Sequence, residues 1–238
     1  MKGFILAAGL GTRLRPLNLD VPKVMVPMGG KPLLEHHLSL FREQGIKDIC
    51  INLHYQPESI RNYFQEGSKF GVRLNYSDEP KLLGTAGAVK KMQDWIGNET
   101  CLVFYGDNLT QIDFQPLQKL HLKHQSAITL VTYPSAEPWT GGVVETDSNG
   151  RVLSWIEKPP RENCKSNLIS SGIFLMEPEI LEVISKNTFS DFGKNVFPEV
   201  LRQQLPFYAF QLKAYIQDIG TPERYAKAEK DFQDGLKF

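Results

Sequence analysis

The sequence lacks the features that would assign it to a membrane, to a disulfide-rich class or to nucleic acid. No apolar segment reaches the length of a membrane-spanning helix. Three cysteines in 238 residues are few, odd in number and widely spaced, so neither a disulfide framework nor a zinc motif follows from them. Basic and acidic residues number 27 each, so no overall charge favours nucleic acid or a membrane surface. Any anion site must therefore be built locally.

The remaining composition is that of an ordinary globular protein. We expect no signal peptide, because the first apolar run is short and leads into a glycine-rich loop. Cys50 and Cys101 lie in strand-like runs, and we expect both to be small buried residues. These observations favour a cytoplasmic enzyme or binding protein, with neither nucleic acid nor a membrane as its partner.

A strand followed by a glycine loop opens the chain. Residues 4–8 form a short apolar run, which is typical of a strand buried on both faces. Gly9 and Gly11 permit positive φ angles and a close approach of the backbone to a ligand, and the loop amides suit a phosphate. Arg13 and Arg15 add forked donors that match phosphate oxygens. This stretch predicts a nucleotide site.

The same loop lacks the spacing of the common phosphate loops. The third glycine of a dinucleotide fingerprint would fall at Leu14, and the Lys-Ser/Thr pair of a P-loop is missing. A lone Gly-x-Gly also occurs in turns that only connect a strand to a helix, so that interpretation stays open on the loop alone.

Apolar periodicity predicts a strand–helix–strand rhythm along the chain. This rhythm is typical of an α/β fold, a mostly parallel sheet with helices on both faces that binds ligands at the carboxyl ends of its strands. Residues 139–157 predict an inserted β-hairpin, so we expect a nucleotide-binding half (1–133) and a second half (134–238) that begins before the hairpin. The predicted helices are 32–44, 57–64, 84–95, 114–125, 178–184, 199–204 and 222–232, and the predicted strands beyond the first and the hairpin are 46–53, 72–76, 101–105, 127–133, 168–176 and 207–212.

Two charged residues stand beside these predicted elements. Asp107 directly follows the apolar run 101–105, and at the sheet edge it could supply a hard oxygen ligand to Mg²⁺. An aspartate in a Gly-Asp-Asn turn can also be a simple turn residue. Lys23 lies between Pro22 and Pro27, which rule out a continuous helix, and its side chain could be solvated or could bind phosphate.

A second small-residue loop, 82–87, precedes a helix whose exposed N-terminal amides could serve a nucleotide. The carboxylate of Glu79 could accept two parallel hydrogen bonds from guanine, or it could only cap or line the loop. His121 and His124 are three residues apart and could chelate a metal. Nothing else nearby supplies ligands, so we expect a partly exposed helix face there.

Taken together, the motifs resemble those of one family. Residues 6–17 and 22–27 are similar in order and spacing to the start of the sugar-1-phosphate nucleotidylyltransferases. The resemblance continues through later motifs over essentially the whole chain, and mannose-1-phosphate and heptose-1-phosphate guanylyltransferases look most similar. It implies a Rossmann-like three-layer α/β/α sandwich with a mixed, mostly parallel central sheet, the GT-A-like nucleotidyltransferase fold. We expect a single domain over residues 1–238, without the C-terminal β-helix domain of some relatives. The resemblance implies that residues 134–238 are the sugar-phosphate half.

The resemblance also implies roles for particular residues. Arg13, Lys23 and Asp107 would be catalytic, and Asp107 with Asp218 would hold Mg²⁺ as the cofactor. The implied nucleotide-binding residues are Leu6, Ala8, Gly9, Gly11, Thr12, Arg13, Lys23, Glu79, Gly84, Thr85 and Gly87. The implied substrate-binding residues are Asn108, Gly142, Glu157, Lys158, Ser171 and Gly172.

The implied reaction transfers a nucleotidyl group from a nucleoside triphosphate to a sugar 1-phosphate and releases pyrophosphate. Glu79 and residues 83–87 favour GTP, with a mannose-like or heptose-like acceptor. UTP, dTTP or CTP with another sugar stays open, as does a cytidylyltransferase for phosphocholine or a phosphonate, because Ser171 stands where the family usually has Asn or Ala. The Trp common near Gln217 is also absent. An inactive regulatory member would be expected to lack one of five charged residues, and this chain has them all: Arg13, Lys23, Asp107, Lys158 and Asp218. The oligomeric state is not readable, with a homo-oligomer among the options.

We expect Arg13→Ala and Asp107→Ala to fold normally and to lose turnover. Removing one group that stabilises developing charge typically lowers the rate about 10²–10³-fold. Pyrophosphate release measures the loss, and near-normal turnover in either variant would refute the role assigned to that residue.

Overall fold

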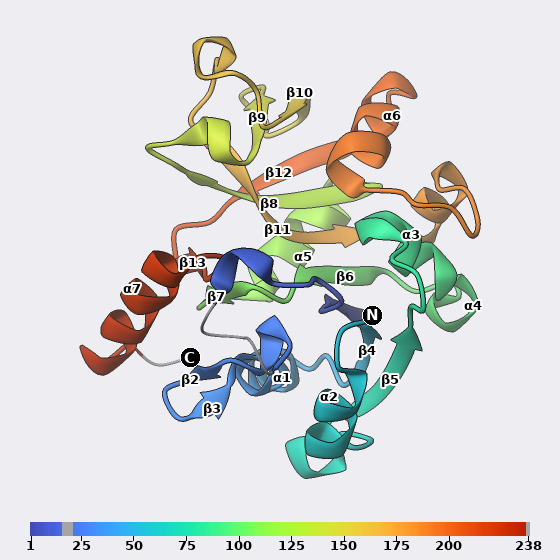
Figure 1. The fold of residues 1–238 in the computed structure, drawn as a ribbon. Coiled ribbons are helices and arrows are strands. Elements are labelled where there is room, and N and C mark those ends of the chain that lie inside the picture. The colour runs from blue at the N-terminus through green and yellow to red at the C-terminus, as the bar shows by residue number, and fades with distance from the viewer. Residues whose placement is uncertain (16–20, 237–238) are drawn as a thin grey trace. The chain divides into compact units, whose positions relative to one another are not determined.

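The computed structural model describes residues 1–15 and 21–236, so Pro16 and Leu17 of the opening motif lie outside the described residues. The chain forms two compact units (Figure 1). The first unit contains Met1–Leu82, Phe104–Ile112 and Ala214–Phe238, and the second contains Leu83–Val103 and Asp113–Lys213. These units do not coincide with the predicted halves, because Ala214–Phe238 belongs to the first unit and the second unit already begins at Leu83.

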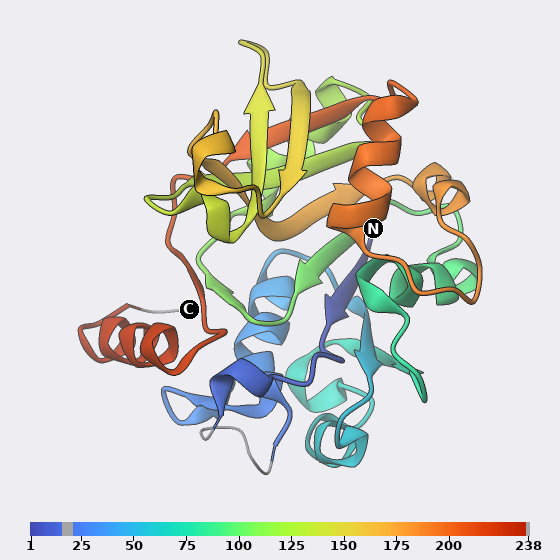
Figure 2. The ribbon, with the colours of Figure 1, turned by 45° about the horizontal axis from the view of Figure 1, so that its top comes forward.

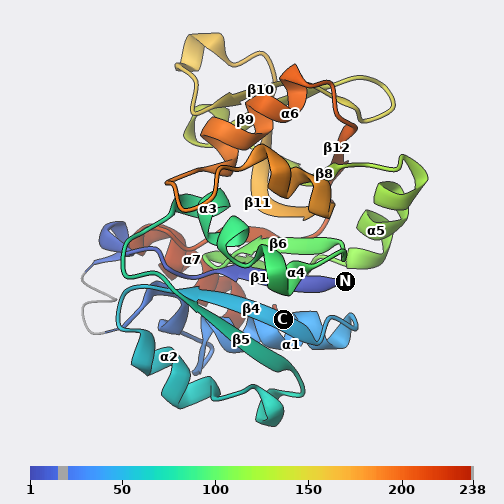
Figure 3. The same ribbon diagram turned by 90° about the vertical axis from the view of Figure 1, so that its right-hand side faces the viewer.

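Three parallel strands form the sheet of the first unit. β1 (Lys2–Leu6) pairs with β4 (Asp48–Leu53), and β4 pairs with β5 (Arg73–Asp78). Figure 3 shows these strands side by side. The middle residues of β1 and β4 are fully buried apolar side chains, as expected for parallel strands. All three strands therefore end at the same edge, where the glycine loop begins.

Helix α1 (Leu33–Glu43) packs its apolar stripe on β1, where Gly3 leaves room for the Phe41 ring. Helix α2 (Pro57–Phe64) follows β4 and buries Ile60 and Phe64. Proline at its first position suits the helix start. Both helices were predicted from their periodicity within one residue or so of these bounds.

The remaining elements of the first unit come from distant parts of the sequence. The short hairpin β2 (Pro27–Met28) and β3 (Lys31–Pro32) lies beside α7 (Pro222–Gln233), as the blue and red ribbons in Figure 2 show. The Tyr225 hydroxyl donates to the carbonyl of Pro27 at 2.5 Å. Strand β7 (Asn108–Thr110) pairs with β13 (Ile216–Asp218). A small core joins these segments: Met28, Leu33, Leu109, Ile219 and Ala228.

The second unit has a mixed sheet. Its strand β11 (Leu168–Met176) pairs antiparallel with β8 (Ile128–Pro134) and with β9 (Gly142–Thr146). β9 forms the predicted hairpin with β10 (Val152–Glu157), and β12 (Phe207–Gln211) runs parallel to β8. β6 (Cys101–Tyr105) leads from this unit into the first. The helices are α3 (Gly84–Lys91), α4 (Gln93–Ile96), α5 (Phe114–Lys123) and α6 (Phe197–Arg202).

The strand pairings confirm an α/β fold with a mixed sheet, and Cys50 and Cys101 are buried as predicted. Three details differ. The helix predicted over 84–95 breaks at Met92, and residues 178–183 form a 3₁₀-helix. The expectation of a partly exposed helix face was wrong for His121, whose ring is buried between Thr129 and Glu177 and bonded to both, at 2.8 and 2.9 Å.

None of the helices within residues 1–15 and 21–236 is both long enough and apolar enough to cross a membrane.

The buried imidazole of His37 on α1 makes stability depend on pH. Its Nε2 donates to the carbonyl of Asn108 at 2.7 Å, and its Nδ1 has no hydrogen-bond partner among the described residues. Burial lowers the pKa of His37 to about 4, although the Asn108 carbonyl partly opposes this shift. The folded protein therefore holds His37 neutral at a pH where the unfolded chain protonates it.

We predict that the free energy of unfolding falls as the pH is lowered from 6.5 to 4. In that window the unfolded state binds the extra proton, and the shift to about 4 corresponds to a loss of about 3 kcal/mol. Urea unfolding of His37→Leu should lack this component, whereas the control His124→Gln should keep it. Parallel pH profiles for wild type and His37→Leu would contradict the prediction.

Candidate active site

The glycine loop leaves β1 as a short irregular turn. Gly11 has φ of 61°, a left-handed conformation that glycine adopts without strain, whereas Gly9 does not have a positive φ. Residues Thr12–Leu14 then form one 3₁₀ turn, which buries Leu14 and leaves Arg13 exposed. The loop is therefore anchored by one apolar side chain and presents a guanidinium to solvent.

Asp107 lies beside the end of β1. The N–H of Gly106 donates to the carbonyl of Leu6 at 3.0 Å, which fixes the turn after β6 against the residue that precedes the glycine loop. The following residue, Asn108, is buried, and its carbonyl accepts the His37 hydrogen bond. This confirms that Asp107 lies at the carboxyl edge of the sheet, near the glycine loop.

Lys23 and Asp107 form an ion pair. Lys23 begins a 3₁₀ turn between Pro22 and Val26, and its Nζ lies 2.6 Å from Asp107 Oδ2. Burial opposes ionisation of Asp107, but the charge and hydrogen bond of Lys23, aided by the charge of Arg13, hold the pKa of Asp107 below its ordinary value. Lys23 is only 9 % exposed, so it is not the solvated lysine that the sequence left open.

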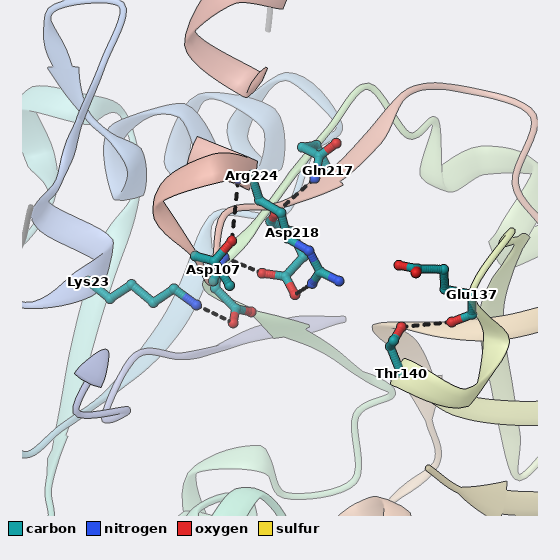
Figure 4. A network of polar contacts seen from close by, with 9 residues as sticks. Lys23, Asp107, Glu137, Thr140, Gln217, Asp218 and Arg224 are labelled. Atoms are coloured by element: carbon teal, nitrogen blue, oxygen red, sulfur yellow. Dashed lines mark hydrogen bonds and ion pairs between the residues drawn. The ribbon is translucent and has the colours of Figure 1, made fainter. Parts of the chain in front are cut away.

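Asp218 reaches the same place from the other end of the sequence. In the β7–β13 ladder Asp218 stands opposite Asn108, and the N–H of Ile219 donates to the carbonyl of Asp107 at 3.0 Å. Arg224 on α7 donates to Asp218 Oδ2 at 2.7 Å, while the N–H of Gly220 donates to Oδ1. Figure 4 shows Lys23 at Asp107 and Arg224 at Asp218.

Gly220 explains why these groups can lie so close together. A Cβ at this position would lie 2.6 Å from Asp218 Oδ1 and 3.2 Å from Lys23 Nζ. Any side chain there would therefore displace one of the two charged groups. Asp218 and Lys23 therefore share a space that glycine leaves open.

The residues present fit a magnesium ion. Mg²⁺ prefers one or two carboxylates completed by phosphate oxygens and water. Asp107 and Asp218 are two partly exposed carboxylates, one directly before β7 and the other in the paired strand β13. Among residues 1–15 and 21–236, no group of three or more His, Cys, Asp or Glu side chains could hold a metal. A site here would thus depend on ligands from a bound phosphate.

Glu79 is buried and already bonded in the structure. Its side chain is 2 % exposed, and its Oε1 accepts a hydrogen bond from Asn52 Nδ2 at 2.7 Å. Asn52 Oδ1 in turn accepts from the N–H of Ala7 at 2.7 Å. This arrangement favours the interpretation that Glu79 lines the loop, and its contact with a guanine base stays a prediction.

In the second unit, the expectation of exposed amides at the start of α3 was wrong for Ala86 and Gly87. The N–H groups of Ala86 and Gly87 donate to the carbonyl of Ser190 at 2.9 and 3.1 Å. The Thr85 hydroxyl donates to Asp191 at 3.0 Å and accepts from the N–H of Phe192 at 2.9 Å. The carbonyl of Ser190 thus accepts hydrogen bonds from two of the N-terminal amides of this helix. Nucleotide binding by Gly84, Thr85 and Gly87 stays a prediction.

Gly142 and Glu157 lie in one packed cluster at the end of the hairpin. A Cβ at Gly142 would lie 2.1 Å from the ring of Trp155, whose Nε1 donates to the carbonyl of Gly193 at 2.7 Å. A Cβ at Gly193 would lie 2.6 Å from Glu157 Oε2 and 3.2 Å from the Trp155 ring. Burial raises the pKa of the Glu157 carboxyl, which the neighbouring Lys158 partly counteracts. The cluster therefore holds a half-buried acid beside an exposed lysine.

Ser171 and Gly172 form a bulge in β11. The Ser171 hydroxyl donates to the carbonyl of Val131 at 2.9 Å and accepts from the N–H of Ile173 at 3.1 Å. Gly172 has φ of 74°, and the register with β8 shifts between Ser170 and Phe174. The Ser171 hydroxyl, which stands where the family usually has Asn or Ala, therefore bonds to the backbone of β8 and β11. Its contact with a substrate stays a prediction.

The structure thus divides the predicted site residues between the two units. Those brought together in the first unit are Leu6, Ala8, Gly9, Gly11, Thr12, Arg13, Lys23, Glu79, Asp107, Asn108 and Asp218, and those in the second are Gly84, Thr85, Gly87, Gly142, Glu157, Lys158, Ser171 and Gly172. Sequence reasoning missed Asn52, Arg224 and Gly220. Arg224 follows the helix start at Thr221 and Pro222, which was recognised, but nothing local indicated its pairing with Asp218.

The chain matches the nucleotidyl transferase family over residues 2–235 and belongs to that family. It is 37% identical over 96% of its length to the UTP–glucose-1-phosphate uridylyltransferase of Synechocystis sp.. It is 31% identical over 98% of its length to the mannose-1-phosphate guanylyltransferase of Mycobacterium tuberculosis. These names confirm the predicted sugar-1-phosphate nucleotidylyltransferase family. The chain spans only 62% and 64% of the lengths of these two relatives.

Solved structures confirm the nucleotidyltransferase fold. HddC from Yersinia pseudotuberculosis, complexed with GMP-PN, is 29% identical with a TM-score of 0.82, and the match covers 97% of this chain and 99% of that one. UDP-glucose pyrophosphorylase complexed with UDP-glucose is 24% identical with a TM-score of 0.85, over 99% of each chain. The mixed, mostly parallel α/β fold is shared by both.

Lys158 has an unusual backbone conformation beside Glu157. Its φ is 47°, which is uncommon for a residue with a side chain and more so before a proline, here Pro159. The turn lets the N–H of Lys158 donate to the carbonyl of Gly141 at 3.0 Å. A residue other than glycine at such an angle typically costs about 1–3 kcal/mol.

We predict that Lys158→Gly leaves the free energy of unfolding unchanged or raises it by up to about 1 kcal/mol. Glycine relieves the strain at φ of 47°, which stabilises the folded state, but it also makes the unfolded chain more flexible, which opposes this gain. Turnover should fall at the same time, because the charge is lost. Gln204→Gly, at another exposed position with φ of 57°, should match it in urea unfolding without losing activity. Equal activity of the two variants would contradict a functional role for Lys158.

Proposed function

We propose that the chain transfers a nucleotidyl group from a nucleoside triphosphate to a sugar 1-phosphate and releases pyrophosphate. The observation that carries the proposal is the acid pair near the glycine loop: Asp218 lies in the β7–β13 ladder, Asp107 directly precedes β7, and the two acids pair with Arg224 and Lys23. Family membership and the names of the relatives support the same reaction.

Asp107 and Asp218 would hold a magnesium ion, which when bound would neutralise phosphate charge. In the structure their negative charge is balanced by Lys23 and Arg224 instead. Two carboxylates and two cationic side chains have little net charge together. A bound cation could therefore take the place of the cationic side chains at the carboxylates, and these side chains could pair with a bound polyphosphate, so that no charge is left uncompensated.

The side chains of this chain then perform positioning and charge compensation. Arg13 and Lys23 would bind the triphosphate, with Arg13 stabilising the charge that develops on the departing pyrophosphate. Lys158 would neutralise the phosphate of the sugar, and Glu157 would accept hydrogen bonds from its hydroxyls. A phosphate oxygen of the acceptor bonds to the α-phosphorus as the bond from that phosphorus to pyrophosphate breaks. No general base is needed, because the acceptor phosphate is already anionic.

For the base and the sugar we propose GTP with a mannose-like or heptose-like 1-phosphate. The relatives named as guanylyltransferases and the similarity to HddC complexed with GMP-PN support this choice. UTP with glucose 1-phosphate is the second candidate, because a relative named as a uridylyltransferase is 37% identical. We also propose a cytoplasmic location, supported by the few, widely spaced cysteines.

A panel of four nucleoside triphosphates and several phosphorylated acceptors, read out by pyrophosphate release with Mg²⁺, tests the proposal. We expect GTP with mannose 1-phosphate or a heptose 1-phosphate to give the highest kcat/KM, and chelation of Mg²⁺ to abolish turnover. A clear preference for UTP or dTTP would end the guanine assignment. Turnover with phosphocholine but with no sugar 1-phosphate would overturn the reaction itself.

A further inference from the structure

A chain of hydrogen bonds crosses the carboxyl ends of the three parallel strands in the first unit. The N–H of Ala7, just beyond β1, donates to Asn52 Oδ1 at 2.7 Å, and Asn52 Nδ2 donates to Glu79 Oε1 at 2.7 Å. Asn52 lies in β4, and Glu79 follows β5. The first residue after β1 is thus tied through one amide side chain to a carboxylate two strands away.

The chemistry of the three groups fixes the direction of this chain. A backbone N–H can only donate, so Asn52 must turn its oxygen towards Ala7. Its amide nitrogen must then face an acceptor, and the Glu79 carboxylate supplies one. Asn52 and Glu79 are 3 % and 2 % exposed, so water does not substitute readily for either partner.

The backbone of Glu79 is fixed as well. Its N–H donates to the carbonyl of Leu53 at 2.8 Å, and its carbonyl accepts from His54 Nδ1 at 2.6 Å. The position of Glu79 is therefore fixed, and the two hydrogen bonds of Asn52 fix the position of Ala7 relative to Glu79. The residues after Ala7 are those of the glycine loop, which leads directly to Arg13.

We propose that Asn52 is a positioning residue, which sets the start of the glycine loop by joining Ala7 to Glu79. The proposal rests on the proposed function, since the loop is placed in order to bind the triphosphate. It assigns Glu79 a task besides any contact with a base, namely to orient the Asn52 amide. Misplacing such a loop by about 1 Å can cost about 10²-fold in turnover.

A swap of donor and acceptor tests this proposal directly. Asn52→Asp keeps the acceptor for Ala7 but places two carboxylates face to face. Asn52→Asp combined with Glu79→Gln restores both hydrogen bonds with the second one reversed. We expect Asn52→Asp to lower kcat about 10²-fold relative to the wild type. In the Glu79→Gln background the same substitution should lower kcat less than about 5-fold relative to Glu79→Gln alone. The KM for the sugar 1-phosphate should stay within about 3-fold in all variants.

Amide hydrogen exchange of Ala7 is the readout that does not need turnover. Protection of this N–H should fall about 10²-fold in Asn52→Asp and return in the double variant. Asn98→Asp, the same change at an exposed position, is the control and should alter neither readout. Asn52→Ser, which is too short to reach both partners but adds no charge, replaces Asn52→Asp if that variant does not fold.

The outcomes separate the two proposals. Equal losses of kcat from Asn52→Asp in both backgrounds, or unchanged Ala7 exchange in a folded Asn52→Asp or Asn52→Ser variant, would overturn the positioning role. A wild-type chain without turnover on any nucleotide and acceptor would overturn the proposed function alone, and the exchange measurement would still decide whether Asn52 holds Ala7. Recovery of both readouts in the double variant supports the inference.

Discussion

The short pairing of β7 with β13 is the interaction on which the candidate site depends. It places Asp218 opposite Asn108 and bonds Ile219 to the carbonyl of Asp107, so two acids 111 positions apart in sequence become neighbours. Bringing two carboxylates together is unfavourable unless their charge is compensated. Lys23 and Arg224 supply that compensation within hydrogen-bond distance, and α7 is anchored to the β2–β3 hairpin so that Arg224 stays in place.

Several glycines of the recognised motifs meet needs of packing as well as any need of a ligand. Gly220 makes room for Asp218 and Lys23, and Gly142 makes room for the Trp155 ring. The start of α3 is closed by the carbonyl of Ser190. Small residues in these motifs therefore do not by themselves indicate contact with substrate, because the protein's own backbone and side chains use part of the space that they leave.

Most elements of the fold could be predicted because their signals are local. The periodicity of α1, the proline at the start of α2, the apolar run of β6 and the turn of the β9–β10 hairpin each lie within a dozen or so residues. The position of Asp107 at the sheet edge followed from the strand before it. The tie between Asn52 and Ala7, the Ser190 cap and the pairing of Arg224 with Asp218 could not be predicted, because each joins segments whose spacing is set only by the tertiary fold. His121 was misjudged for the same reason, since its burial comes from β8 and Glu177 and not from its own helix.

The return of residues Ala214–Phe238 to the N-terminal unit has a consequence for biosynthesis. During translation β1, β4 and β5 leave the ribosome early and can pair, and Lys23 can meet Asp107 once β6 has been made. The second acid arrives only after about a hundred further residues, which form the other unit, have been synthesised. While those residues are being made, the nascent chain contains Asp107 without Asp218, so the acid pair forms only after the second unit has been synthesised.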